Sequence, residues 1–205
     1  MNSSTGVQRL PLRQAWPAAR LLADAFLADP VMTAVWPRAR RHRLLVLRSF
    51  FIIEMLIAYG RDGLVYGGYE GDRLVGVVLA FLDGERGFPW WTWAPRVLPG
   101  LIAGPFSALR ALRAYNDFSG LQPPQAHVHF WQIGAEEGTR GVGMMLMRTV
   151  LDRHVDNEGR SAYLEASAPL LAQLYALVGF EPRERCQLPS GDVLTTMWRP
   201  AREAA

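Results

Sequence analysis

The chain carries the stretch Gly138-Thr139-Arg140-Gly141-Val142-Gly143 between two runs of different character. The preceding run, residues 127–133, is rich in β-branched and aromatic residues and is typical of a strand. The following run, residues 144–155, has apolar residues at helical spacing. A glycine-rich turn that opens a helix leaves several backbone N–H groups unpaired, and the helix dipole makes that end positive. The stretch therefore predicts an anion site suited to a phosphate or a pyrophosphate.

Two common phosphate-binding loops do not fit these residues. A Walker-type loop needs a lysine that reaches the outer phosphates, but all 22 basic residues of this chain are arginines. A dinucleotide fingerprint needs the pattern G-x-G-x-x-G, and counted from Gly141 its third glycine falls on Leu146. What remains is an R-G-x-G turn that follows a strand.

Length and composition favour one soluble globular domain that spans residues 1–205. Half of the residues are hydrophobic and 20% are charged. The net charge is +3 and the arginines are spread along the chain, so a nucleic-acid partner is not expected. The one local basic run, residues 38–43, is expected to be the solvated start of a helix.

The apolar segments and the cysteine content bear on location. The most apolar segment, residues 44–59, is interrupted by Arg48 and Glu54, which predicts a buried helix and no membrane partner. Residues 1–10 lack the apolar centre of a signal peptide. The single cysteine, Cys186, excludes an internal disulfide and favours a reducing compartment. We therefore expect a cytoplasmic protein.

The order of predicted elements indicates an α/β fold with a mixed sheet flanked by helices. The expected strands are 7–12, 64–69, 74–82, 127–133, 161–166, 180–188 and 193–198. The expected helices are 14–27, 40–59, a helical part within 96–118, 141–157, and one that Ser167 caps and Gly179 closes. The strand–helix–strand order after residue 127 requires a parallel or splayed pair, whereas the hairpins require antiparallel pairing.

The R-G-x-G turn resembles the acyl-CoA pyrophosphate loop of the GNAT superfamily of N-acyltransferases, whose usual pattern is Q/R-x-x-G-x-G/A. The similarity is strongest over residues 125–200. There the runs 163–167, 174–175, 179–181 and 197–199 resemble bacterial members near the puromycin N-acetyltransferase branch. The first half matches more loosely, through Ala25-Phe26 and Asp29-Pro30.

The resemblance implies a mostly antiparallel central sheet with a splayed parallel strand pair, and it implies acetyl-CoA (coenzyme A) as the cofactor. It also implies that Tyr175 acts as the general acid toward the coenzyme A thiolate. The implied cofactor-binding residues are the strand edge along the pantetheine and the loop at the pyrophosphate: Trp131, Gln132, Ile133, Gly138, Thr139, Arg140, Gly141, Val142, Gly143 and Met144.

The chain departs from the family pattern at three positions. Gly138 stands where Gln or Arg is usual, and Ala168 and Leu171 replace asparagines that are common between the strand and the tyrosine. The pyrophosphate contact survives these changes because it relies on backbone groups. A side-chain contact to pantetheine is lost.

His127 and His129 are candidates for the base that deprotonates the acceptor amine. They lie two apart on a strand, so both side chains point to one face, and histidine titrates near neutral pH. The arrangement resembles arylalkylamine N-acetyltransferases. The alternative is a pair of buried, hydrogen-bonded histidines, with no metal site because the spacing places no third ligand. Glu165 is a second candidate base or a structural carboxylate, and Tyr175 could equally be a core tyrosine.

An aromatic loop is the candidate acceptor-binding segment. Trp90, Trp91 and Trp93, together with Phe26, could cover an aromatic acceptor. The same tryptophans could instead form a packed plug or a dimer contact.

We therefore hypothesise an acetyl-CoA-dependent N-acetyltransferase. It would move the acetyl group directly to a primary amine of a small molecule in a ternary complex, and it could be a homodimer. The alternative is a catalytically silent acyl-CoA sensor, which the changes at Ala168 and Leu171 motivate. A preference for longer acyl chains is a third interpretation, because residues 88–109 are apolar.

Overall fold

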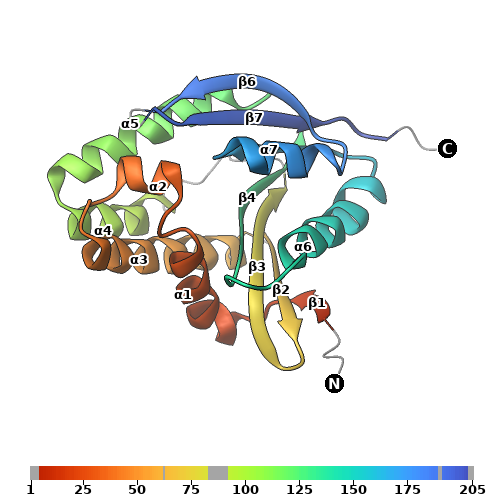
Figure 1. The fold of residues 1–205 in the computed structure, drawn as a ribbon, viewed down its shortest axis with the longest axis horizontal. Helices are drawn as coiled ribbons and strands as arrows, with labels where there is room; N and C mark the ends of the chain where they lie inside the picture. The colour runs from red at the N-terminus through yellow and green to blue at the C-terminus, as the bar shows by residue number, and fades with distance from the viewer. Residues whose placement is uncertain (1–4, 62, 83–91, 189–190, 203–205) are drawn as a thin grey trace.

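Seven strands form one mixed sheet with helices on both faces (Figure 1). The structure is a computed structural model, and it describes residues 5–61, 63–82, 92–188 and 191–202. The strand order is β1-β2-β3-β4-β5-β7-β6. The strands are β1 (Thr5–Arg9), β2 (Leu64–Glu70), β3 (Arg73–Leu82), β4 (His127–Ala135), β5 (Ser161–Ala166), β6 (Glu181–Gln187) and β7 (Val193–Arg199).

One strand pair is parallel, and it separates along its length. Strands β4 and β5 pair in parallel only from His127↔Ser161 to Phe130↔Leu164, while β4 continues to Ala135. The other neighbouring strands pair antiparallel. This confirms the predicted mixed α/β sheet with a splayed parallel pair. Beyond Phe130, no strand in the described part of the chain pairs with the edge of β4 that faces β5.

The helices form two layers around the sheet. They are η1 (Leu12–Gln14), α1 (Ala15–Ala25), α2 (Pro30–Val35), α3 (Arg40–Tyr59), α4 (Trp93–Ala103), α5 (Pro105–Leu121), α6 (Val142–Val150), the π-helical η3 (Leu151–Asp156) and α7 (Pro169–Ala176). Helices α1 and α3 pack on one face of the sheet, and α6, η3 and α7 pack on the other. In the described residues, no helix is both long and apolar enough to cross a membrane.

Two glycines let α6 approach the sheet closely. A Cβ atom at Gly76 would lie 2.6 Å from Cγ1 of Val142, and one at Gly68 would lie 2.8 Å from the same atom. Larger residues at these positions would displace the first turn of α6, because atoms cannot pack at such distances. The close contact fixes where the loop before α6 lies relative to β3 and β4.

Several helix and strand limits differ from the prediction. The first strand ends at Arg9, and residues 12–14 form a 3-10 turn. Asp29 does not close α1 but caps α2, a helix that the sequence analysis did not identify: its Oδ1 accepts from the N–H groups of Val31 (2.9 Å) and Met32 (3.1 Å). The predicted helix within 96–118 is two helices, because Gly104 adopts a φ of 86° between them and Pro105 opens the second.

The predicted cap at Ser167 is wrong. Ala168 occupies the N-cap position of α7, and no side chain of the described residues caps that helix. The Ser167 hydroxyl instead donates to Oδ2 of Asp29 at 2.6 Å. The prediction failed because Ser167 has a partner 138 residues away, whereas a capping rule considers only the next three residues.

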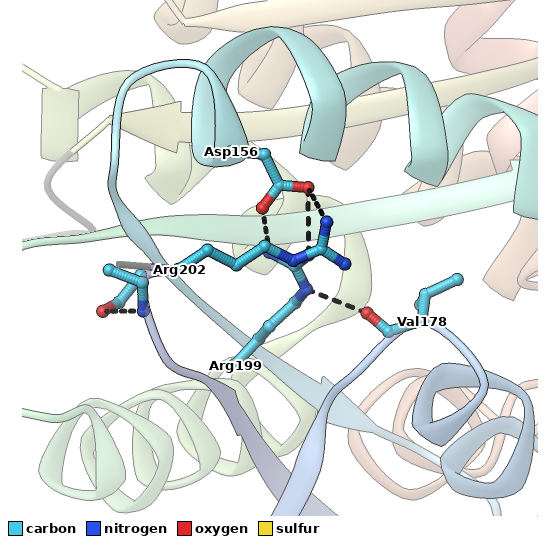
Figure 2. A network of polar contacts seen from close by, with 6 residues as sticks. Asp156, Val178, Arg199 and Arg202 are labelled. Atoms are coloured by element: carbon cyan, nitrogen blue, oxygen red, sulfur yellow. Dashed lines mark hydrogen bonds and ion pairs between the residues drawn. The ribbon is translucent and has the colours of Figure 1, made fainter. Parts of the chain in front are cut away.

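A buried ion pair ties the C-terminal strand to two helix ends (Figure 2). The guanidinium of Arg199 donates to both carboxylate oxygens of Asp156, at 2.7 and 3.0 Å, and its Nε donates to the carbonyl of Val178 at 2.9 Å. Asp156 ends η3, and Val178 lies just after α7. The pair therefore holds the ends of the two helical segments that follow the glycine-rich loop and strand β5.

Candidate active site

The glycine-rich loop has the backbone geometry of an anion site. Gly138 and Gly141 have φ values of 89° and 78°, a region that residues with a side chain rarely adopt. The N–H and hydroxyl of Thr139 both donate to the carbonyl of Glu136, which closes the turn. Gly141 is the N-cap of α6, and within the described chain nothing accepts from the N–H groups of the first three helical residues, Val142, Gly143 and Met144. These N–H groups are available to an anion.

The structure contains a cavity of about 610 Å³. It extends to the place where β4 and β5 separate, because its wall includes Gln132 and Ile133 of β4 and Glu165 of β5. Ile133 also adjoins the loop, since a Cβ atom on Gly143 would lie 3.8 Å from its Cγ2. Much of the rest of the wall comes from α2 to α5 and α7, with further residues from β4, β5 and β7, and it is mainly apolar. Such a concave apolar site with a few polar groups is typical of small-molecule binding.

Tyr175 of α7 lies in the cavity wall, and the pKa of its phenol is raised. Burial, and then the negative charge of Asp29, raises the pKa of Tyr175 to about 12. The phenol is therefore neutral at physiological pH and can donate a proton. The position agrees with the general-acid role that the resemblance implied, and that role stays a prediction.

The two histidines share a face but do not reach the cavity. The rings of His127 and His129 lie 6.1 Å apart and both contact the ring of Tyr163 edge-on. Both are buried, and among the described residues that line the cavity neither histidine is present. Nε2 of His129 lies 2.9 Å from Oε2 of Glu165, which does line the cavity. The group of this pair that an acceptor can touch is therefore the carboxylate.

His127 has a different environment. Its Nδ1 lies 2.7 Å from the carbonyl oxygen of Gln125, and its ring packs edge-on against Trp198 at 5.7 Å. This is the environment of a buried, hydrogen-bonded histidine. Nothing in these contacts links His127 to the cavity, so its assignment as a base has less support than that of His129.

The sequence analysis missed an acid–hydroxyl pair in the cavity wall. Asp29 and Ser167 both line the cavity, and the hydroxyl donates to the carboxylate at 2.6 Å. Burial raises the pKa of Asp29 above its ordinary value, although its hydrogen bonds oppose the shift. Asp29-Pro30 carried a local signal, since Asp followed by Pro is a common helix start, but that signal indicates a cap and not a site.

A second missed pair joins α3 to α4. The carboxylate of Glu54 is wholly buried and accepts two hydrogen bonds from Arg96, both at 2.8 Å. Both residues line the cavity. Each of these two residues interrupts an otherwise apolar segment, and this was visible in the sequence. Because a buried ion pair contributes little net stability, such a charge is a candidate functional residue.

The structure describes only some of the aromatic residues that were expected to bind the acceptor. Phe26 lines the cavity, and its ring packs on Phe51 at 5.4 Å. Trp90 and Trp91 lie outside the described residues. Trp93 begins α4, but its side chain is also outside the described part. Trp131 lines the cavity from β4. The described chain holds no cluster of three metal-ligating side chains.

Comparison with known proteins identifies the fold. No protein-family model matches the sequence, and no curated protein matches it. Solved structures do match. The "histone acetyltransferase HPA2 and related acetyltransferase" of Corynebacterium glutamicum has a TM-score of 0.73 and 22% identity, with 98% of this chain and 99% of that chain covered.

Two further solved structures are similar over nearly their whole length. The C-terminal condensation domain of Ebony, in complex with beta-alanyl-dopamine, has a TM-score of 0.63 and 14% identity, covering 96% of this chain and 98% of that one. A mosquito arylalkylamine N-acetyltransferase like 5b has a TM-score of 0.59 and 12% identity, covering 96% and 99%. The chain therefore has the fold of the GNAT acetyltransferases.

Proposed function

We propose that the protein is an acetyl-CoA-dependent N-acetyltransferase that transfers the acetyl group directly to an amine in a ternary complex. One observation carries this proposal: a single cavity reaches the gap between β4 and β5 and has Tyr175, Glu165 and Ile133 in its wall, and Ile133 lies beside Gly143 of the loop with the unpaired N–H groups. The similar acetyltransferases of known structure support the same reading.

The residues present fit coenzyme A. The N–H groups of Val142, Gly143 and Met144 would hold the pyrophosphate, and the exposed Arg140 adds positive charge beside them. The edge of β4 at Gln132 and Ile133 has no β5 partner, so its backbone groups are open to the amide groups of pantetheine. Bound acetyl-CoA would supply the activated acetyl group.

The chain's own residues would then move two protons. Glu165, held by His129, would take the proton that the acceptor ammonium must lose before its nitrogen can attack. Tyr175 would donate its phenolic proton to the departing sulfur. The charge of Asp29 favours the protonated phenol, which keeps Tyr175 in the donor state.

The cavity favours an amine with an apolar body. Its wall is mainly aliphatic and aromatic, and the carboxylates of Asp29 and Glu165 would attract an ammonium group. The Ebony domain was solved with beta-alanyl-dopamine, and the mosquito protein is described as an arylalkylamine N-acetyltransferase. We therefore place arylalkylamines and alkylamines first among candidate acceptors.

The placement near the bacterial puromycin N-acetyltransferase branch stays a prediction, as do the cytoplasmic location and the homodimer. The runs 163–167 and 179–181 support the branch assignment, and the single cysteine supports the location.

The alternative function is an acyl-CoA sensor without turnover. Leu171 lines the cavity with an aliphatic side chain where the family pattern has an asparagine. Calorimetry with acetyl-CoA, combined with a thiol-release assay over a panel of amines, separates the two functions. Binding with amine-dependent release supports the enzyme. Binding without release from any amine supports the sensor, and absence of binding contradicts both.

A further inference from the structure

The hairpin of helices α4 and α5 presents an apolar surface to solvent. Six of the 13 large apolar side chains that are exposed in the described residues lie on these two helices. Leu101 and Phe106, on either side of the turn at Gly104, are 73% and 80% exposed. We call this surface the α4–α5 apolar face. Three of its members, Leu98, Phe106 and Leu109, lie outside the cavity wall, whereas Val97, Leu101 and Leu112 also line the cavity. Exposed apolar surfaces of this kind mark a binding face.

Charge is nearly absent from this part of the hairpin. Residues 93–109 contain one charged residue, Arg96. Its guanidinium turns inward and donates twice to the buried carboxylate of Glu54. The exposed residues of α4 therefore offer water no charged group, which makes the face costly to leave in solvent.

Positive charge surrounds the face. Nε2 of His42 lies 2.7 Å from the carbonyl oxygen of Ile102, so the first turn of α3 adjoins the end of α4, and the two helices lie side by side in Figure 1. Arg40 and Arg41 are exposed on that turn, and Arg113 is exposed on α5 one turn after Leu109.

The distribution of charged residues along the chain also places positive charge near this face. Helices α3, α4 and α5 carry seven of the 22 arginines and two acidic residues, Glu54 and Asp117. Because the net charge of the chain is only +3, the remaining segments are net negative. The molecule therefore has a basic, apolar end formed by α3, α4 and α5.

We propose that the α4–α5 apolar face docks on an anionic lipid bilayer. Its leucines and Phe106 enter the headgroup region, while Arg40, Arg41 and Arg113 contact lipid phosphates. A second copy of this chain fits less well, because a two-fold contact through this face would bring together two basic ends. This proposal departs from the expectation of no membrane partner, which rested on the absence of a membrane-spanning segment.

Vesicle co-sedimentation of the full chain tests this docking and requires no acetyl-CoA, so it is independent of the proposed reaction. The wild type is expected to bind vesicles that contain phosphatidylglycerol, to bind pure phosphatidylcholine vesicles more weakly, and to lose affinity as salt rises. The triple variant Leu98→Ser, Phe106→Ser, Leu109→Ser is expected to bind at least about tenfold more weakly. None of these three residues lines the cavity.

Two further variants separate the contribution of the arginines from that of the apolar side chains. Arg40→Gln with Arg41→Gln should weaken binding about tenfold and flatten its salt dependence. Leu12→Ser with Leu177→Ser removes exposed leucines from other surfaces and should bind as the wild type does. Failure of the wild type to bind anionic vesicles, or unchanged binding by the triple variant, would overturn the proposal. So would a dimer in equilibrium sedimentation without lipid that the triple variant converts to a monomer.

Discussion

Oε2 of Glu165 lies 2.9 Å from Nε2 of His129, and of these two side chains only Glu165 lines the cavity. The histidine is fully buried behind the carboxylate. In the proposed reaction, an acceptor amine would therefore meet the carboxylate first, and the histidine would act by orienting that carboxylate. This arrangement changes the expected order of importance among the candidate bases.

Glu165→Gln should lower kcat by about 100-fold, because the amide cannot take a proton from the acceptor. The KM for acetyl-CoA should change little, since Glu165 is not part of the pyrophosphate loop. His129→Gln should lower kcat by a smaller factor. Steady-state kinetics with varied amine and varied acetyl-CoA measure both effects.

His154→Gln is the matched control for the histidine variant. Nε2 of His154 lies 2.8 Å from the hydroxyl of Tyr66, and the residue is outside the cavity wall. Its substitution should leave kcat within about twofold, because it makes no contact with the proposed reacting groups. Equal losses in the two histidine variants would show that His129 has no specific role.

Tyr175→Phe should remove the proton donor and lower kcat by about 100-fold without a comparable change in acetyl-CoA affinity. The same variant should remove one phenol that ionises near pH 12 instead of near the ordinary value of 10. The difference in ultraviolet absorbance between wild type and variant during an alkaline titration shows this directly. A phenol that ionises near its ordinary pKa would contradict the buried position of Tyr175.

The raised pKa of Tyr175 also makes the free energy of unfolding depend on pH. Between about pH 10 and pH 12 the unfolded chain loses this proton while the folded chain keeps it. The free energy of unfolding should therefore fall as pH rises through this window, and Tyr175→Phe should reduce the steepness of the fall. Denaturant titrations of both proteins across the window provide the measurement.

The two glycines at the start of α6 should respond differently to alanine. Gly141→Ala should lower the free energy of unfolding by about 1 kcal/mol, because position 141 has a φ of 78°. Gly143→Ala should leave the stability unchanged or raise it slightly, since its Cβ would make an ordinary contact with Ile133 at 3.8 Å. Urea unfolding compares the two variants, and equal losses would contradict the loop geometry.

The ion pair in Figure 2 should be important for stability. Arg199→Met should lower the free energy of unfolding by about 3 kcal/mol, because it leaves the Asp156 carboxylate without its buried partner. Arg202→Gln is the matched control, since Arg202 is 71% exposed and lies 3.6 Å from the same carboxylate. It should change the stability by less than about 0.5 kcal/mol. Similar losses for the two arginines would contradict the central position of Arg199.

Local pattern was enough to predict the sheet and the loop. The alternation of turn residues and β-rich runs predicted the seven strands and the mixed sheet, and the glycines on either side of Arg140 predicted the turn that opens α6. Helix α3 and strand β5 were also predicted at their observed limits, because their residues carry a strong period and clear end signals.

Local patterns could not predict which polar residues of the cavity pair with one another. Asp29 and Ser167 meet across the fold, and Arg96 reaches Glu54 from a different helix. The two residues of each pair lie far apart in the sequence, so neither segment by itself indicates the partner. The burial of His129 behind Glu165 also depends on the register of β4 against β5, which the sequence pattern does not specify.

The crystal structure of the protein with coenzyme A tests the central claim most directly. The account predicts the diphosphate within hydrogen-bond distance of the N–H groups of Val142, Gly143 and Met144, pantetheine along β4 at Gln132 and Ile133, and sulfur next to the hydroxyl of Tyr175. Coenzyme A bound elsewhere on the molecule, or a diphosphate that does not touch the loop before α6, would contradict the account.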